Sequence, residues 1–295
     1  MAVPSLITLE EHFVATSIEG SADRYGGWHA PIVSKLRSLG DERLQDMEAG
    51  EVSLQIISHA PHVANAEDCR RGNDELAKAC KANSKKFAGF AMLPMLEPEA
   101  AAEELERTVK EYGFLGALIN NSEDGIMYDD EKYWKVFEKA QDLDVPIYIH
   151  PSFPGDALAD HYKGNFSDRV AFMMSIASWG WHAETGLHIL RLFAAGLFDR
   201  FPKLKLIIGH DGEMLPFMLD RTLPLSKVWG ERKRDLRKVW QEQIWVTTSA
   251  VSVNLLSFPK SRSSPKYAWS QLILLPFASD VQSGTSRLSA PCQPY

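Results

Sequence analysis

Short apolar segments alternate with longer helical patterns along most of the chain, and this alternation restricts the possible folds more than any other feature. The apolar segments cover residues 5–9, 52–58, 87–93, 115–119, 145–149, 204–208, 244–248 and 273–278. The helical patterns cover residues 32–49, 68–84, 97–112, 130–142, 183–197 and 213–229. No two-residue hairpin signal joins neighbouring strands, which are therefore expected to be parallel. The pattern predicts an α/β fold, a (β/α)8 barrel rather than an open doubly wound sheet.

The length of 295 residues suits one such barrel, which typically needs about 250 residues. No interdomain linker is evident, so residues 1–295 are predicted to form a single domain. Residues 257–295 depart from the pattern, because they hold nine Ser, five Pro and one acidic residue, Asp280. We expect the last βα unit to be truncated or irregular. Residues 151–182 form a long, aromatic-rich connection, and such loops usually cover a site.

Composition excludes several classes of protein. The net charge of −7 comes without a basic block, which argues against nucleic-acid binding. No run approaches the roughly 20 apolar residues of a membrane span. Cys69, Cys80 and Cys292 are scattered, which predicts neither a disulfide framework nor a thiolate metal site. The start of the chain lacks a secretory signal pattern, so a reducing, cytoplasmic location is expected.

Ligand-type side chains stand at the ends of three predicted strands. Glu10 and His12 follow the first strand, and alternation with period two places them on one face. His150 ends the fifth strand, and His210 and Glu213 follow the sixth, where Gly209 and Gly212 permit a tight turn. Each could separately be an ordinary polar residue at a strand end. Together they favour a metal site at the mouth of a parallel barrel.

The residue types limit the metal. Carboxylate and imidazole suit a hard or borderline divalent ion, and zinc, manganese and magnesium all remain possible. Asp280 is the one carboxylate near the predicted eighth strand and is a candidate further ligand. Its presence in the unusual final segment leaves the alternative that it is accidental.

Four other residues have both a functional and a structural interpretation. His59 could contact substrate or be a polar loop residue. Trp181 and His182 could wall an aromatic-binding pocket, or pack as a local cluster. Arg221 lies a little over two helical turns beyond Glu213, so it could reach a substrate carboxylate or form an ion pair on the helix surface.

Three motifs resemble the amidohydrolase-2 family, which includes aminocarboxymuconate-semialdehyde decarboxylase and the γ-resorcylate and 2,3-dihydroxybenzoate decarboxylases. They are Leu-Glu-Glu-His-Phe at 9–13, Ile-Tyr-Ile-His-Pro at 147–151, and Ile-Ile-Gly-His-Asp-Gly-Glu-Met-Leu-Pro-Phe at 207–217. The resemblance covers about residues 5–250. It implies a barrel with one divalent ion, a homodimer or homotetramer, and non-oxidative decarboxylation of a hydroxylated aromatic acid.

The same resemblance implies roles for individual residues. Glu10, His12, His150 and Asp280 resemble the metal ligands. His210 and Glu213 resemble the catalytic pair, Asp280 the proton donor, and Arg221 a supporting residue. The family's Ser-x-Asp-Tyr-Pro-Phe stretch is replaced by Ala-Ser-Asp-Val-Gln at 278–282, which puts the role of Asp280 in question. Two alternatives stay open: a metal-dependent hydrolase of a lactone or amide, and a non-catalytic paralogue.

Overall fold

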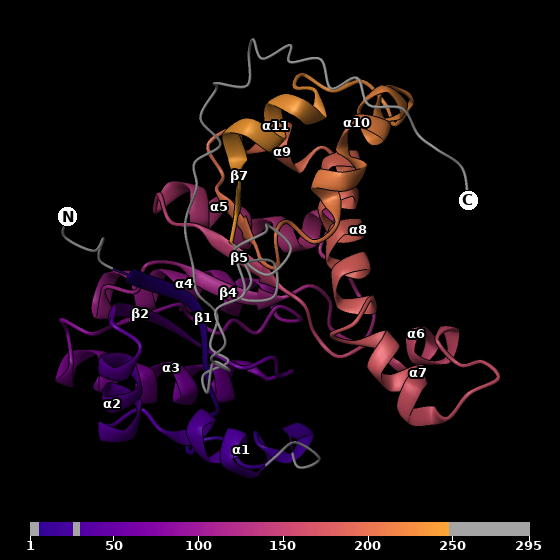
Figure 1. Ribbon diagram of the computed structural model, residues 1–295. Coiled ribbons are helices and arrows are strands. Elements are labelled where there is room, and N and C mark those ends of the chain that lie inside the picture. Colours follow the sequence, from indigo (N-terminus) through magenta and orange to yellow (C-terminus); the bar gives the residue numbers. More distant parts are fainter. Residues whose placement is uncertain (1–5, 26–29, 248–295) are drawn as a thin grey trace, which may run out of the picture.

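The computed structural model describes residues 6–25 and 30–247, in which consecutive parallel strands alternate with helices (Figure 1). The strands are β1 (Leu6–Phe13), β2 (Val52–His59), β3 (Phe87–Gly89), β4 (Ala117–Asn120), β5 (Ile147–His150), β6 (Leu206–Ile208) and β7 (Ile244–Val246). They pair in chain order as β1-β2-β3 and β4-β5-β6-β7, and a parallel bridge between Ala91 and Ala117 connects the two groups. The predicted α/β barrel is therefore present through seven strands. The predicted strand at 273–278 and the segment 257–295 lie outside the described residues.

Helices connect the strands. They are α1 (Ala30–Arg37), α2 (Asp41–Ala49), α3 (Ala66–Ala82), α4 (Pro98–Tyr112), α5 (Trp134–Asp142), α6 (Asp156–His161), α7 (Asp168–Ser175), α8 (Gly180–Ala195), α9 (Leu197–Arg200), α10 (Leu215–Leu225) and α11 (Leu236–Gln243), with 3-10 turns at Asp23–Tyr25, Glu131–Tyr133 and Ser226–Val228. Local interactions explain where several of these helices begin and end. Asn65 caps α3 by accepting from the Asp68 N–H. Helix α4 begins with Pro98, and Gly113 with φ 68° caps its C-terminal end.

Three segments differ from the sequence-based prediction. The helix expected over 32–49 is two helices, which are separated at residues 38–40, where Gly40 disfavours helix. Helix α11 was not predicted, although Asp235 caps it and Leu236, Val239 and Trp240 bury one face. The connection 151–182 contains α6 and α7, which project away from the strands (Figure 1).

The barrel interior is a layer with one inward-pointing side chain from each of six successive strands or strand ends. Its members are Leu9, Ile56, Phe90, Leu118, Tyr148 and Ile207. Trp245 of β7 and Ala88 of β3 pack against them. A filled interior of this kind is the expected core of a (β/α)8 barrel. It forms the floor beneath the strand ends that carry the predicted ligands.

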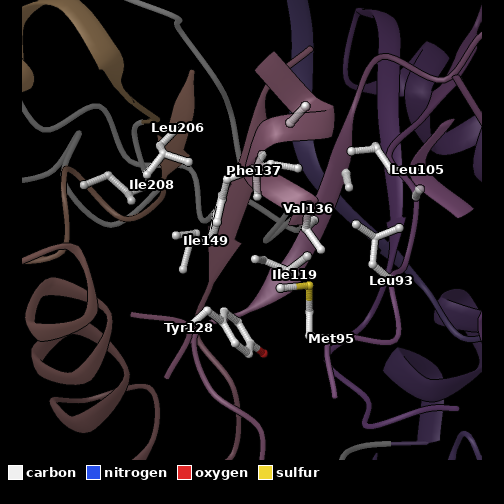
Figure 2. Packing of buried hydrophobic residues seen from close by; sticks show 14 of the residues in the cluster. Leu93, Met95, Leu105, Ile119, Tyr128, Val136, Phe137, Ile149, Leu206 and Ile208 are labelled. Carbon is white, nitrogen blue, oxygen red and sulfur yellow. The ribbon is translucent and has the colours of Figure 1, made fainter. Parts of the chain in front are cut away.

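The alternate strand residues point outward and pack under the helices. Ile119, Ile149, Leu206 and Ile208 lie against a larger cluster that includes Leu105 of α4 and Val136 and Phe137 of α5 (Figure 2). Each such buried aliphatic or aromatic side chain contributes roughly 1.5–3 kcal/mol. None of the helices in residues 6–25 and 30–247 combines the length with the apolar character that a membrane-spanning helix requires.

The low pKa values of two buried histidines lead us to expect that acid destabilises the fold. Burial lowers the pKa of His59 to about 4 and that of His188 to about 3, from an ordinary value of 6.5. The unfolded chain therefore binds more protons below pH 6.5, so the stability that these groups contribute is complete above that pH and is lost as pH falls. We expect the unfolding free energy to fall by roughly 1.4 kcal/mol per pH unit per histidine between about pH 6 and 4.5.

Urea unfolding at a series of pH values measures this slope. His188→Asn should make it shallower, whereas His161→Asn on the exposed end of α6 should leave it unchanged. Equal slopes for His188→Asn and the parent would contradict the assignment to His188.

Candidate metal and catalytic centre

A β-bulge in β1 points Glu10 and His12 into the barrel. Thr8 pairs with Gln55 and Glu11 with Ile57, so β1 has one more residue than β2 in this stretch. Glu10 takes up the extra residue with φ 62°. Leu9 points inward, and regular alternation would have turned Glu10 and His12 outward. The bulge reverses the alternation, so Glu11 instead faces Arg43 with 3.8 Å between Oε2 and Nη1.

Glu10, His12 and His150 converge at the end of the barrel. His12 Nε2 lies 3.2 Å from His150 Nε2, which lies 3.1 Å from Glu10 Oε1. His150 Nδ1 donates to the Pro151 carbonyl at 2.6 Å, which orients the ring so that Nε2 faces the site. Burial lowers the pKa of His12 to about 3, so this imidazole is neutral. Two imidazoles and a carboxylate, with ligand atoms within 4.8 Å of one another, fit a divalent cation.

Tyr148 fixes the Glu10 side chain through a hydrogen bond. Sequence analysis did not predict this role. Tyr148 Oη donates to Glu10 Oε2 at 2.7 Å, and its ring belongs to the interior layer. The available signal was its position two residues before His150, which puts both on one face of β5. Gly209 is needed for close packing here, because a Cβ would lie 2.5 Å from Tyr148 Oη and 3.3 Å from Glu10 Oε2.

Replacing Gly209 by Ala should weaken metal binding while the protein stays folded. The added methyl displaces Tyr148, and loss of an outer hydrogen-bond partner typically lowers metal affinity about 10–100-fold. Isothermal titration with Mn²⁺ measures the change. Gly40→Ala is a matched control, because a Cβ there would meet nothing within 4 Å. Equal Mn²⁺ affinity in the two variants would show that the methyl group added at Gly209 does not displace Tyr148.

The turn after β6 has an unusual backbone. Residues 210–214 all have positive φ, with 48° at His210, 59° at Asp211, 89° at Gly212, 52° at Glu213 and 65° at Met214. Only one of the five is glycine, and each other residue costs about 1–3 kcal/mol in this region. Asp211 N–H donates to the Thr247 carbonyl at 2.9 Å, and Gly212 N–H to the Gly209 carbonyl at 2.8 Å. The strained turn places the His210 and Glu213 side chains face to face.

His210 connects this turn to the group formed by Glu10, His12 and His150, which we call the ligand cluster. Its Nδ1 lies 2.7 Å from Glu213 Oε1, and its Nε2 lies 2.9 Å from Glu10 Oε1. Burial alone would lower the pKa of His210, but the carboxylates of Glu10 and Glu213 outweigh it and hold that pKa well above its ordinary value. Burial would raise the pKa of Glu213, yet hydrogen bonds from His182 and His210 lower it. The pair is therefore suited to hold a proton beside the predicted metal ligands.

The remaining predicted residues lie in different surroundings. His182 Nδ1 lies 2.8 Å from Glu213 Oε2, so His182 contacts the predicted catalytic pair of His210 and Glu213. The Trp181 ring lies edge-on to Phe153, with 6.0 Å between the two ring centroids. Arg221 is exposed on α10 and makes no ion pair with any other residue that the structure describes.

His59 has a structural position. Its Nε2 accepts from the Ala15 N–H at 3.0 Å, and its Nδ1 donates to the Ala60 carbonyl at 2.6 Å. Both ring nitrogens are thus engaged with backbone, which leaves neither for a substrate. Asp280 lies outside the described residues.

Known proteins match this chain over most of its length. The family described as Amidohydrolase matches residues 12–275. The decarboxylase orsB of Emericella nidulans is 48% identical over 257 residues, or 83% of this chain and 78% of the relative. The γ-resorcylate decarboxylase of Polaromonas sp. is 37% identical over 265 residues, or 82% of this chain and 79% of the relative.

A solved structure extends the match to three dimensions. It is a dihydroxybenzoic acid decarboxylase from Polaromonas sp., with bound manganese and the inhibitor 2-nitroresorcinol. It has a TM-score of 0.73 and 35% identity, and the match covers 84% of this chain and 79% of that one. These matches confirm the resemblance predicted from the three motifs. The chain belongs to the amidohydrolase family, and its relatives there include named decarboxylases.

Proposed function

We propose that this protein is a metal-dependent decarboxylase that releases CO2 from a hydroxylated aromatic carboxylic acid without oxidation. The observation that carries the proposal is the meeting of Glu10, His12 and His150 with the His210–Glu213 pair at one end of the barrel. The names of the matched relatives support the reaction class. The manganese and nitroresorcinol in the solved relative support a divalent ion and a hydroxylated aromatic ligand.

Glu10, His12 and His150 would hold the ion, with Asp280 proposed as a further ligand. A divalent ion there would supply Lewis-acid stabilisation of negative charge on the substrate. Its identity among zinc, manganese and magnesium is left to experiment, because oxygen and imidazole ligands suit several ions.

The reaction requires one proton for each carboxylate lost, because ArCOO⁻ and H⁺ give ArH and CO2. His210 presents Nε2 toward the ligand cluster, where it would polarise a ring hydroxyl and hold a proton. Glu213 stabilises the charged imidazole through Nδ1. We propose Asp280 as the residue that delivers the proton to the ring carbon, and Arg221 as a support for the substrate carboxylate. Trp181 is proposed to lie along the aromatic side of the substrate site.

CO2 release by the full-length protein tests this function. Candidate substrates are γ-resorcylate, 2,3-dihydroxybenzoate and a methylsalicylate, each assayed before and after chelation and after addition of Mn²⁺, Zn²⁺ or Mg²⁺. Release that chelation abolishes and a metal restores supports the proposal. Opening of a lactone without CO2 release would support a hydrolase instead. Absence of both activities in metal-loaded protein would support a non-catalytic paralogue.

We further propose a single barrel domain that assembles as a homodimer or homotetramer in the cytoplasm. Exposed apolar side chains support assembly, because Phe217 is 89% and Val228 84% accessible near α10. The free thiols of Cys69 and Cys80 support a reducing compartment. Light scattering coupled to size exclusion measures the assembly.

A further inference from the structure

We propose that His182 is a positioning residue, which holds the Glu213 carboxylate so that Glu213 orients His210 toward the ligand cluster. The inference rests on the proposed function, because it gives His182 a part in the same reaction. It differs from the sequence-based expectation that His182 contacts the substrate.

The Glu213 carboxylate is clamped between two imidazoles. Its Oε2 lies 2.8 Å from His182 Nδ1, and its Oε1 lies 2.7 Å from His210 Nδ1. The two rings are 5.0 Å apart between centroids and inclined at 69°. The Glu213 side chain is fully buried, whereas that of His182 is 24% accessible. Each carboxylate oxygen thus has one nitrogen partner, and removal of His182 leaves Oε2 without its partner.

His182 is itself fixed at both ring nitrogens. Nε2 donates to the Ala177 carbonyl at 3.1 Å, while Nδ1 faces Glu213. Each ring nitrogen therefore faces an oxygen acceptor of the protein. Neither nitrogen remains for a substrate, so the ring acts through Glu213.

Helix α8 packs closely against the turn of residues 210–214. Gly186 follows His182 by four residues, so both lie on one face of the helix. A Cβ on Gly186 would lie 2.6 Å from the Glu213 carbonyl oxygen. The helix therefore contacts the Glu213 backbone through Gly186 and its side chain through His182. These two contacts steady the left-handed turn of residues 210–214, whose own backbone preferences oppose it.

A second interpretation gives His182, His210 and Glu213 a metal ion of their own, because their ligand atoms lie within 4.8 Å. An ion there would have to replace the two direct hydrogen bonds to Glu213. Metal content decides between the two: about one ion per chain agrees with positioning, and two ions that fall to one in His182→Ala would overturn it.

Kinetics of two variants test the positioning role. His182→Ala should lower kcat about 10–100-fold with little change in KM, because small misplacements of catalytic groups cost up to about 100-fold. His182→Asn should restore most of kcat, because the Asn amide can donate where Nδ1 did. Leu187→Ala, on the exposed face of α8, is the control. Unchanged kcat in His182→Ala, a rise in KM alone, or an Asn variant as slow as the Ala variant would each overturn the proposal.

A readout that needs no activity separates this inference from the proposed function. Imidazole N–H resonances of the ¹⁵N-histidine-labelled full chain report hydrogen bonds to Glu213, and the His210 signal is assigned with a His210→Gln variant. His182→Ala should shift the His210 signal, and His182→Asn should largely restore it. If the parent chain decarboxylates nothing in the panel, the proposed function fails while this measurement still stands. An unmoved His210 signal in His182→Ala overturns the positioning role.

Discussion

Glu10→Gln should remove bound metal and, with it, turnover. Glu10 is the carboxylate of the ligand cluster, and it contacts His150, His210 and Tyr148 within 3.1 Å. Burial alone would raise its pKa, but the imidazoles of His210 and His150 hold that pKa well below the ordinary value, so Glu10 carries the negative charge that a cation needs. Loss of an outer-sphere partner alone costs about 10–100-fold in metal affinity, so loss of this ligand should cost more than about 100-fold. Elemental analysis and Mn²⁺ titration measure the change.

The next residue provides a matched control. Glu11→Gln is the same substitution one position along, but Glu11 faces Arg43 rather than the site. We expect it to keep one metal ion per chain and to unfold at lower temperature, because a buried Arg43 loses its compensating charge. If Glu11→Gln lost metal as readily as Glu10→Gln, the bulge would not separate the two side chains as described.

His210→Ala should abolish most catalysis while metal remains bound. His210 lies between Glu10 and Glu213 but is outside the cluster of Glu10, His12 and His150. Loss of a positioned acid–base group lowers kcat about 10²–10⁴-fold. Steady-state CO2 release and metal content, measured on the same preparation, test both halves of the expectation.

Substitution of an exposed histidine controls for the change of residue type. His161→Ala at the end of α6 should match the parent in kcat and in metal content. Loss of metal from His210→Ala would place His210 among the ligands instead of beside them. A kcat near that of the parent would remove it from the mechanism.

Alternation within β5 was open to prediction from the sequence alone. Its pattern puts Ile147 and Ile149 on one face and Tyr148 and His150 on the other, and the structure has this arrangement. A strand of four residues with parallel partners on both sides has little freedom, so local pattern decides which side chains enter the barrel.

The same reasoning could not predict β1. Period two correctly put Glu10 and His12 on one face, but the sequence carries no sign of the bulge that makes this face the inner one. A left-handed Glu10 costs energy locally and persists because pairing with β2 and the contact with Tyr148 oppose its relaxation. The left-handed turn at 210–214 is a second such case, since Gly212 is the single glycine in it.

The amino-acid sequence by itself determined the alternation of strands and helices, the family motifs, and the residue types that can bind a divalent ion. It did so because periodicity and ligand chemistry are local properties of the chain. Tertiary structure alone decided three contacts: the hydrogen bond from Tyr148 to Glu10, the hydrogen bonds between His59 and backbone groups, and the contact between His182 and Glu213. Those pairings join residues up to 138 positions apart, and they arise only when barrel closure and helix docking set the distances between them.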